Sequence, residues 1–129
     1  MRIHHIGYLV KHMAKAVTKF KLLGYEIERE AVFDPDRQVT ICFMVNSGYR
    51  VELICPQGKE SPVYGLLSKY RNSPYHICYE CGSLPESMET LAGNGFMVIQ
   101  EPARAVALEN RQVVFLMGAD MGMIELLEV

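Results

Sequence analysis

An internal repeat is the feature that most constrains the fold, because a stretch near the start of the chain returns in its second half. "HHIGYLV" at 4–10 matches "YHICYEC" at 75–81, which places His76 71 residues after His5. Three further segment pairs follow in the same order: "LGYEI" 23–27 with "NGFMV" 94–98, "RQV" 37–39 with "RQV" 111–113, and "VELI" 51–54 with "IELL" 124–127. Four ordered matches predict two copies of one structural unit.

Each copy has the residue pattern of a strand, a helix and three strands. In the first copy, residues 2–10 predict a strand, "MAKAVTKFKLLG" predicts a helix ended by Gly24, and the later strands are expected at 25–33, 38–46 and 48–55. In the second copy, Ser83 and Glu86 predict a capping box with Pro85 just inside the helix, and the later strands are expected at 96–101, 111–117 and 122–128.

These elements predict an α+β fold made of two tandem βαβββ modules in a single domain, 1–129. The first module is expected at 1–55 and the second at 74–129. The connector at 56–73 is rich in turn residues at both ends and is expected to hold a short helix around 62–70.

Charge and composition exclude several classes of partner. The 129 residues carry a formal net charge of −2 with both signs mixed along the chain, so we expect no nucleic-acid or membrane partner. No apolar run approaches the roughly 20 residues that a membrane span needs. The chain enters a strand pattern without a secretory leader, so we expect a cytoplasmic protein whose four cysteines are reduced.

The repeat selects two histidines and two glutamates as a metal site. His5 aligns with His76 and Glu52 with Glu125, whereas His4 aligns with Tyr75 and is given a structural role. Each glutamate stands between aliphatic residues, where a buried and uncompensated carboxylate is costly. Two imidazoles and two carboxylates suit one divalent ion such as Ni, Co, Zn or Mn.

Each of these residues has an ordinary alternative when it is taken alone. A single histidine in a buried strand is more often a hydrogen-bonded core residue, and a single glutamate in "VELI" is more often exposed. The matched positions of all four favour the metal site. Glu128 is expected on the face opposite to Glu125, in solvent.

Other motifs carry weaker signals. "CYEC" at 78–81 has the form C-x-x-C, but residues three apart in a strand point to opposite faces and no second such motif exists, so we expect no metal or redox site there. Three basic residues are candidates for contacting a phosphate or carboxylate of a substrate: Lys59, Arg104 and Arg111.

The segments "HHIGYLV", "GYRVELICP", "SPVYGLLSKY", "YHICYEC" and "IELLE" together resemble the vicinal oxygen chelate superfamily of glyoxalase, bleomycin-resistance and dioxygenase proteins. The resemblance covers essentially the whole chain. It implies paired βαβββ modules that form a curled mixed sheet around a metal cleft, a homodimer, and metal ligands at the four positions that the repeat selects: His5, Glu52, His76 and Glu125.

Within that superfamily, "SPVYGLLSK" followed by "HIC" most resembles methylmalonyl-CoA epimerases, with small glyoxalase I-like proteins next. The resemblance implies an epimerase or isomerase that acts on an acyl-CoA and removes a proton alpha to a carbonyl or thioester, with Glu125 as the base. A glyoxalase I-like lyase acting on a thiol adduct (lactoylglutathione lyase type) is the first alternative. A metabolite- or antibiotic-binding resistance protein is the second. Some epimerases carry an additional glutamate on the third strand of the first module, where this chain has Ile41, and this disfavours two-base epimerisation.

Overall fold

A computed structural model describes residues 1–129, and its elements follow the predicted order of strand, helix and three strands twice over. The elements are β1 (Arg2–Leu9), α1 (Met13–Leu22), β2 (Glu26–Asp34), β3 (Val39–Asn46), β4 (Tyr49–Pro56), α2 (Pro62–Tyr70), β5 (Ser73–Cys81), α3 (Leu84–Ala92), β6 (Phe96–Ala105), β7 (Arg111–Gly118) and β8 (Gly122–Glu128). The short helix predicted at 62–70 is confirmed as α2. None of the helices has the length and apolar character that crossing a membrane requires.

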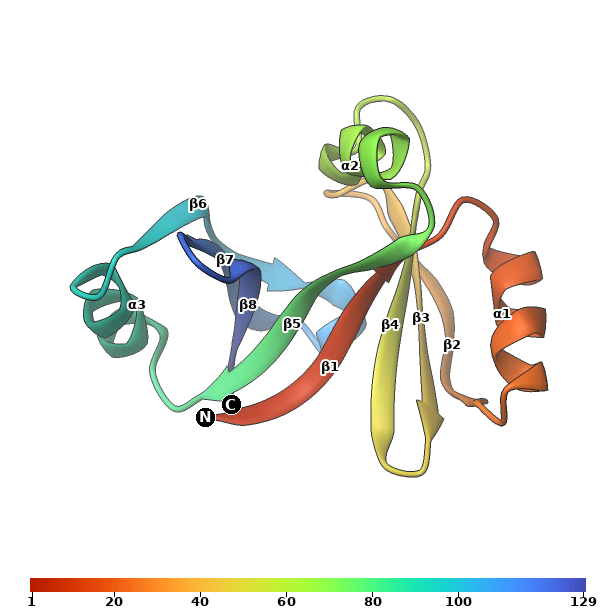
Figure 1. Ribbon diagram of the computed structural model, residues 1–129, viewed down its shortest axis with the longest axis horizontal. Coiled ribbons are helices and arrows are strands. Elements are labelled where there is room, and N and C mark those ends of the chain that lie inside the picture. Colours follow the sequence, from red (N-terminus) through yellow and green to blue (C-terminus); the bar gives the residue numbers. More distant parts are fainter. The chain divides into compact units, whose positions relative to one another are not determined.

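The chain forms two compact units (Figure 1). The first comprises His5–Tyr75 and is called the N-terminal unit below. The second comprises His76–Val129 together with Met1–His4 and is called the C-terminal unit.

The strands of the N-terminal unit lie in the order β2-β3-β4-β1. β1 runs parallel to β4, with Gly7 opposite Glu52, and β3 runs antiparallel to β4, with Phe43 opposite Glu52. Because side chains alternate between the two faces of a strand, His5 and Gly7 share one face with Glu52 and Phe43. The register of this sheet therefore selects which residues meet at the candidate site.

The other face of the same sheet forms the hydrophobic core of the N-terminal unit, against α1 (Figure 1). Met44 and Leu53 are fully buried there, and Phe20 of α1 packs edge to face against Tyr8 with ring centroids 5.2 Å apart. Gly24 follows the helix with a φ of +97°, the left-handed conformation that the sequence predicts for a helix end. This face supplies stability, which leaves the opposite face available for polar groups.

The C-terminal unit repeats this arrangement with strands in the order β5-β8-β7-β6. β5 runs parallel to β8 with Cys78 opposite Glu125, and β7 runs antiparallel to β8 with Phe115 opposite Glu125. α3 covers the other face, where Leu116 and Leu126 are fully buried. One half of the predicted capping box is confirmed, because the Ser83 hydroxyl accepts a hydrogen bond from the backbone N–H of Glu86.

Two buried cysteines of the N-terminal unit have thiols with raised pKa values. All four cysteines are buried and free, as expected for reduced thiols. Burial raises the pKa of the Cys42 thiol, and the Glu30 carboxylate raises it further. Burial likewise raises the pKa of the Cys55 thiol, so both groups stay protonated at neutral pH.

Glu128 corrects one expectation. It lies on the face opposite to Glu125, as predicted, but it is half-buried rather than solvated. Its Oε2 accepts a hydrogen bond of 2.8 Å from the backbone N–H of Leu84, the first residue of α3. A carboxylate at this position satisfies a free N–H and interacts favourably with the helix dipole.

Replacing Glu128 with Ala is expected to lower the free energy of unfolding by about 1 kcal/mol, because the N-terminus of α3 loses its acceptor and its compensating charge. Urea denaturation at neutral pH measures the change. Glu89→Ala, which removes an exposed carboxylate of the same helix, is the control and should have little effect. Equal unfolding midpoints for the two variants would refute the capping role.

Candidate metal centre

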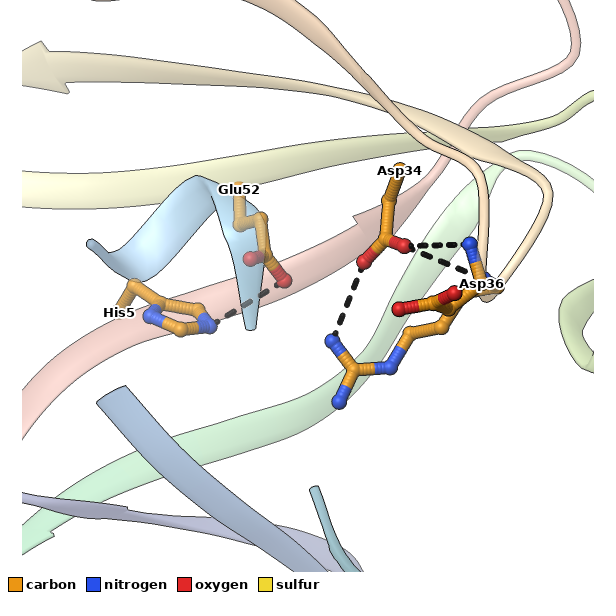
Figure 2. A network of polar contacts seen from close by, with 5 residues as sticks. His5, Asp34, Asp36 and Glu52 are labelled. Atoms are coloured by element: carbon orange, nitrogen blue, oxygen red, sulfur yellow. Dashed lines mark hydrogen bonds and ion pairs between the residues drawn. The ribbon is translucent and has the colours of Figure 1, made fainter. Parts of the chain in front are cut away.

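The N-terminal unit contains a buried pair of His5 and Glu52. Parallel pairing of β1 and β4 places Gly7 opposite Glu52, so His5 lies two residues earlier on the same face. His5 Nε2 lies 3.3 Å from Glu52 Oε1, and the residues are only 1% and 5% exposed (Figure 2). The strand register thus brings an imidazole and a carboxylate together in a water-poor environment.

The C-terminal unit contains the equivalent pair of His76 and Glu125. Here β5 and β8 place Cys78 opposite Glu125, and His76 again lies two residues earlier on the same face. His76 Nε2 lies 3.0 Å from Glu125 Oε2, and the residues are 4% and 3% exposed. The sequence repeat therefore reproduces the same pair, with the same ring nitrogen and the same register, in both units.

A phenylalanine packs against the histidine of each pair, and the sequence analysis did not identify it. Phe43 packs edge to face against His5 with ring centroids 5.3 Å apart, and Phe115 packs in the same way against His76 at 5.2 Å. Both phenylalanines stand directly opposite the glutamate of their pair. Aligning "ICF" at 41–43 with "VVF" at 113–115 would have revealed them.

The donor chemistry of the two pairs fits a divalent cation. Burying a carboxylate away from water costs several kcal/mol even after the protein relaxes, so a structure that does so twice at matched positions needs compensation. A neutral imidazole nitrogen and a carboxylate oxygen are both good ligands for Ni, Co, Zn and Mn. Each unit offers one donor of each kind at the same place.

Other polar residues have different partners. Arg104 Nη1 donates to the carbonyl of Asn110, and Arg111 Nε donates to the carbonyl of Leu108. In the N-terminal unit, the buried Asp34 forms an ion pair with Arg37, which the sequence analysis did not identify (Figure 2).

Comparison with known proteins identifies the family of the chain. The sequence profile of the Glyoxalase/Bleomycin resistance protein/Dioxygenase superfamily matches residues 4–115. The chain belongs to this superfamily. The family resemblance inferred from the sequence is thereby confirmed.

Two curated relatives from this superfamily are similar along most of the chain. Methylmalonyl-CoA epimerase of Homo sapiens mitochondria is 28% identical over 123 residues, covering 94% of this chain and 69% of the relative. An ethylmalonyl-CoA/methylmalonyl-CoA epimerase of Cereibacter sphaeroides is 27% identical over 121 residues, covering 92% and 90%.

A solved structure shows the same superfamily fold. It is a variant of Streptomyces coelicolor methylmalonyl-CoA epimerase in complex with 2-nitronate-propionyl-CoA. It matches with a TM-score of 0.85 at 20% identity, covering 99% of this chain and 94% of that one. The α+β fold predicted from the sequence is therefore confirmed.

Ile41 is the residue at which the family resemblance suggested an additional glutamate in some epimerases. It lies on β3 two residues before Phe43, so its side chain is on the face that carries Glu52. The residue is 5% exposed and stands opposite Ile54. An aliphatic side chain there offers no proton acceptor to a substrate.

Comparing a single and a double variant of the first pair should show that burying the Glu52 carboxylate without its imidazole partner destabilises the fold. His5→Leu removes the imidazole beside the buried carboxylate, so we expect the free energy of unfolding to fall by about 3 kcal/mol. The double variant His5→Leu/Glu52→Leu also removes the buried charge and should be more stable than His5→Leu. Chemical denaturation in the presence of a chelator measures both. A double variant that is less stable than His5→Leu would contradict this account.

Proposed function

We propose that the protein is a divalent-metal-dependent epimerase that removes the proton alpha to the thioester carbonyl of an acyl-CoA of the methylmalonyl-CoA type. The observation that carries this proposal is the duplicated buried His–Glu pair. Relatives named as methylmalonyl-CoA epimerases, 27–28% identical over more than nine-tenths of the chain, support the same reaction class.

We assign the metal ligands to both pairs acting together: His5, Glu52, His76 and Glu125. The set has two imidazole nitrogens and two carboxylate oxygens, which suits Ni, Co, Zn or Mn. When bound, such a cation supplies Lewis-acid stabilisation of the negative charge that develops on a carbonyl oxygen.

We assign Glu125 as the group that moves the proton. Its carboxylate is buried beside His76 and walled by Phe115, so little water competes for it. Glu125 accepts the proton from the carbon alpha to the carbonyl, and the electron pair of the broken C–H bond delocalises toward the carbonyl oxygen. A proton that derives from solvent is then delivered to the opposite face of that carbon, and Glu125 releases the proton it accepted to solvent, which completes epimerisation.

Ile41 favours one alternative, a glyoxalase I-like lyase acting on a thiol adduct. Epimerisation removes a proton from one face of the reacting carbon and delivers a proton to the other face, so it uses a proton-transfer group on each face. Moving a proton between neighbouring carbons of a hemithioacetal needs only one carboxylate. The aliphatic residue at position 41 removes one candidate for the second group. A binding protein without catalysis is less consistent with the chain, because sequestration does not require two buried His–Glu pairs.

We further propose that the protein acts as a homodimer in the cytoplasm. The four free buried thiols suit a reducing compartment. β6 pairs only with β7 and exposes Met97 and Ile99 at 70% and 45%, which is apolar surface of the kind that subunit contacts cover.

Incubation with methylmalonyl-CoA in D2O tests the reaction. With Ni, Co, Zn or Mn added, we expect one deuterium to appear at the alpha carbon, detected by mass spectrometry. If no exchange occurs with any of these metals and the protein converts methylglyoxal plus a thiol, the lyase function is correct and the epimerase function is wrong.

Glu125→Gln is expected to slow the exchange by 100-fold or more, about the range that a general base contributes, because an amide cannot accept the proton. Glu128→Gln changes a carboxylate of the same strand on the opposite face and should retain exchange. Measuring both at saturating metal separates proton transfer from metal affinity. Equal rates for the two variants would remove Glu125 from the mechanism.

A further inference from the structure

A buried ion pair at the end of β2 lies on the same face of the N-terminal unit as the His5–Glu52 pair. Asp34 stands opposite Val39, and Val39 lies four residues before Phe43 on β3, so the two share a face. Phe43 in turn stands opposite Glu52. Asp34 is therefore on the candidate site's side of the sheet, as Figure 2 shows.

The Asp34 carboxylate fixes the turn that follows β2. Its Oδ1 accepts hydrogen bonds from the backbone N–H groups of Asp36 at 3.0 Å and Arg37 at 3.2 Å. Its Oδ2 accepts one from Arg37 Nη1 at 3.4 Å (Figure 2). The residue is 1% exposed, so the carboxylate holds the guanidinium at a defined place.

The Arg37 guanidinium has more donors than the protein uses. It carries five N–H groups, and its one side-chain contact with the protein is through Nη1. The side chain is nonetheless only 18% exposed. A largely buried guanidinium with spare donors is typical of a group that binds an oxyanion in a bidentate manner.

We propose that Arg37 binds an oxyanion of the acyl-CoA substrate, with Asp34 as the residue that positions it. The inference rests on the proposed function and names the contact that anchors the substrate away from the reacting carbon. Two strand spacings and four residues along β3 separate Asp34 from Glu52, which corresponds to about 15 Å between their Cα atoms. That separation favours a phosphate of the CoA part over the carboxylate of the acyl part.

Steady-state kinetics with methylmalonyl-CoA test the contact. Arg37→Gln should raise KM about tenfold or more, with kcat within about twofold, because the contact is remote from the reacting carbon. Arg37→Lys should recover part of the loss, since it keeps the charge but not the fork geometry. Asp34→Asn keeps an acceptor for the turn while removing the charge, and it should raise KM less than Arg37→Gln.

Arg71→Gln is the matched control, because Arg71 is an exposed arginine of the same unit and its loss changes the net charge equally. Its KM should equal that of the wild type. A purely structural role for Arg37 would lower thermal stability and leave KM unchanged, and that result would overturn the proposal.

A truncated substrate identifies the oxyanion. If Arg37 binds a phosphate, the KM penalty of Arg37→Gln disappears with methylmalonyl-pantetheine, which lacks the CoA phosphates. If Arg37 binds the acyl carboxylate, the penalty persists with the truncated thioester. Both results support an oxyanion contact, and KM values within twofold of the wild type for both thioesters would overturn it.

Direct binding separates this inference from the proposed reaction. If wild-type protein shows no deuterium exchange, titration calorimetry with CoA and with malonate still measures the site. Tighter binding of either probe by the wild type than by Arg37→Gln supports the oxyanion contact. Equal binding, or no binding of either probe by the wild type, overturns it.

Discussion

The whole arrangement depends on placing a carboxylate and an imidazole side by side, away from water, in each unit. Glu52 with His5 and Glu125 with His76 are almost completely buried, and such burial works against folding unless something compensates it. The opposite faces of the two sheets carry the apolar contacts with α1 and α3. Strand alternation thus separates the residues that stabilise each unit from those that serve the site.

Much of this could be predicted from the sequence because a repeat with period-two side-chain alternation specifies which face each residue occupies. The repeat selects His5 over His4, because only His5 aligns with a second histidine. The parallel register of β1 and β4 then brings His5 into contact with Glu52. Phe43 and Phe115 were missed because an aromatic residue within an apolar run gives no local signal of what it faces. Glu128 was misjudged because its partner, the first N–H of α3, comes 44 residues earlier in the chain.

Arg37 was missed for a related reason. In "DPDRQ" the aspartates and the arginine have the composition of an ordinary exposed turn. Only the pairing of β2 with β3 shows that Asp34 lies on the face of the sheet that carries Glu52 and holds the guanidinium there. Ile41, in contrast, was identified from the sequence, because its aliphatic side chain is evident there. The structure adds only that this side chain lies on the face of the sheet that carries Glu52.

We propose that the two His–Glu pairs hold one cation together rather than one cation each. X-ray absorption spectroscopy of the protein loaded with cobalt or zinc, combined with metal analysis, tests it most directly. We expect one tightly bound ion per chain, coordinated by two imidazoles. Two ions per chain with one imidazole each would show that the pairs bind metal separately and would contradict it.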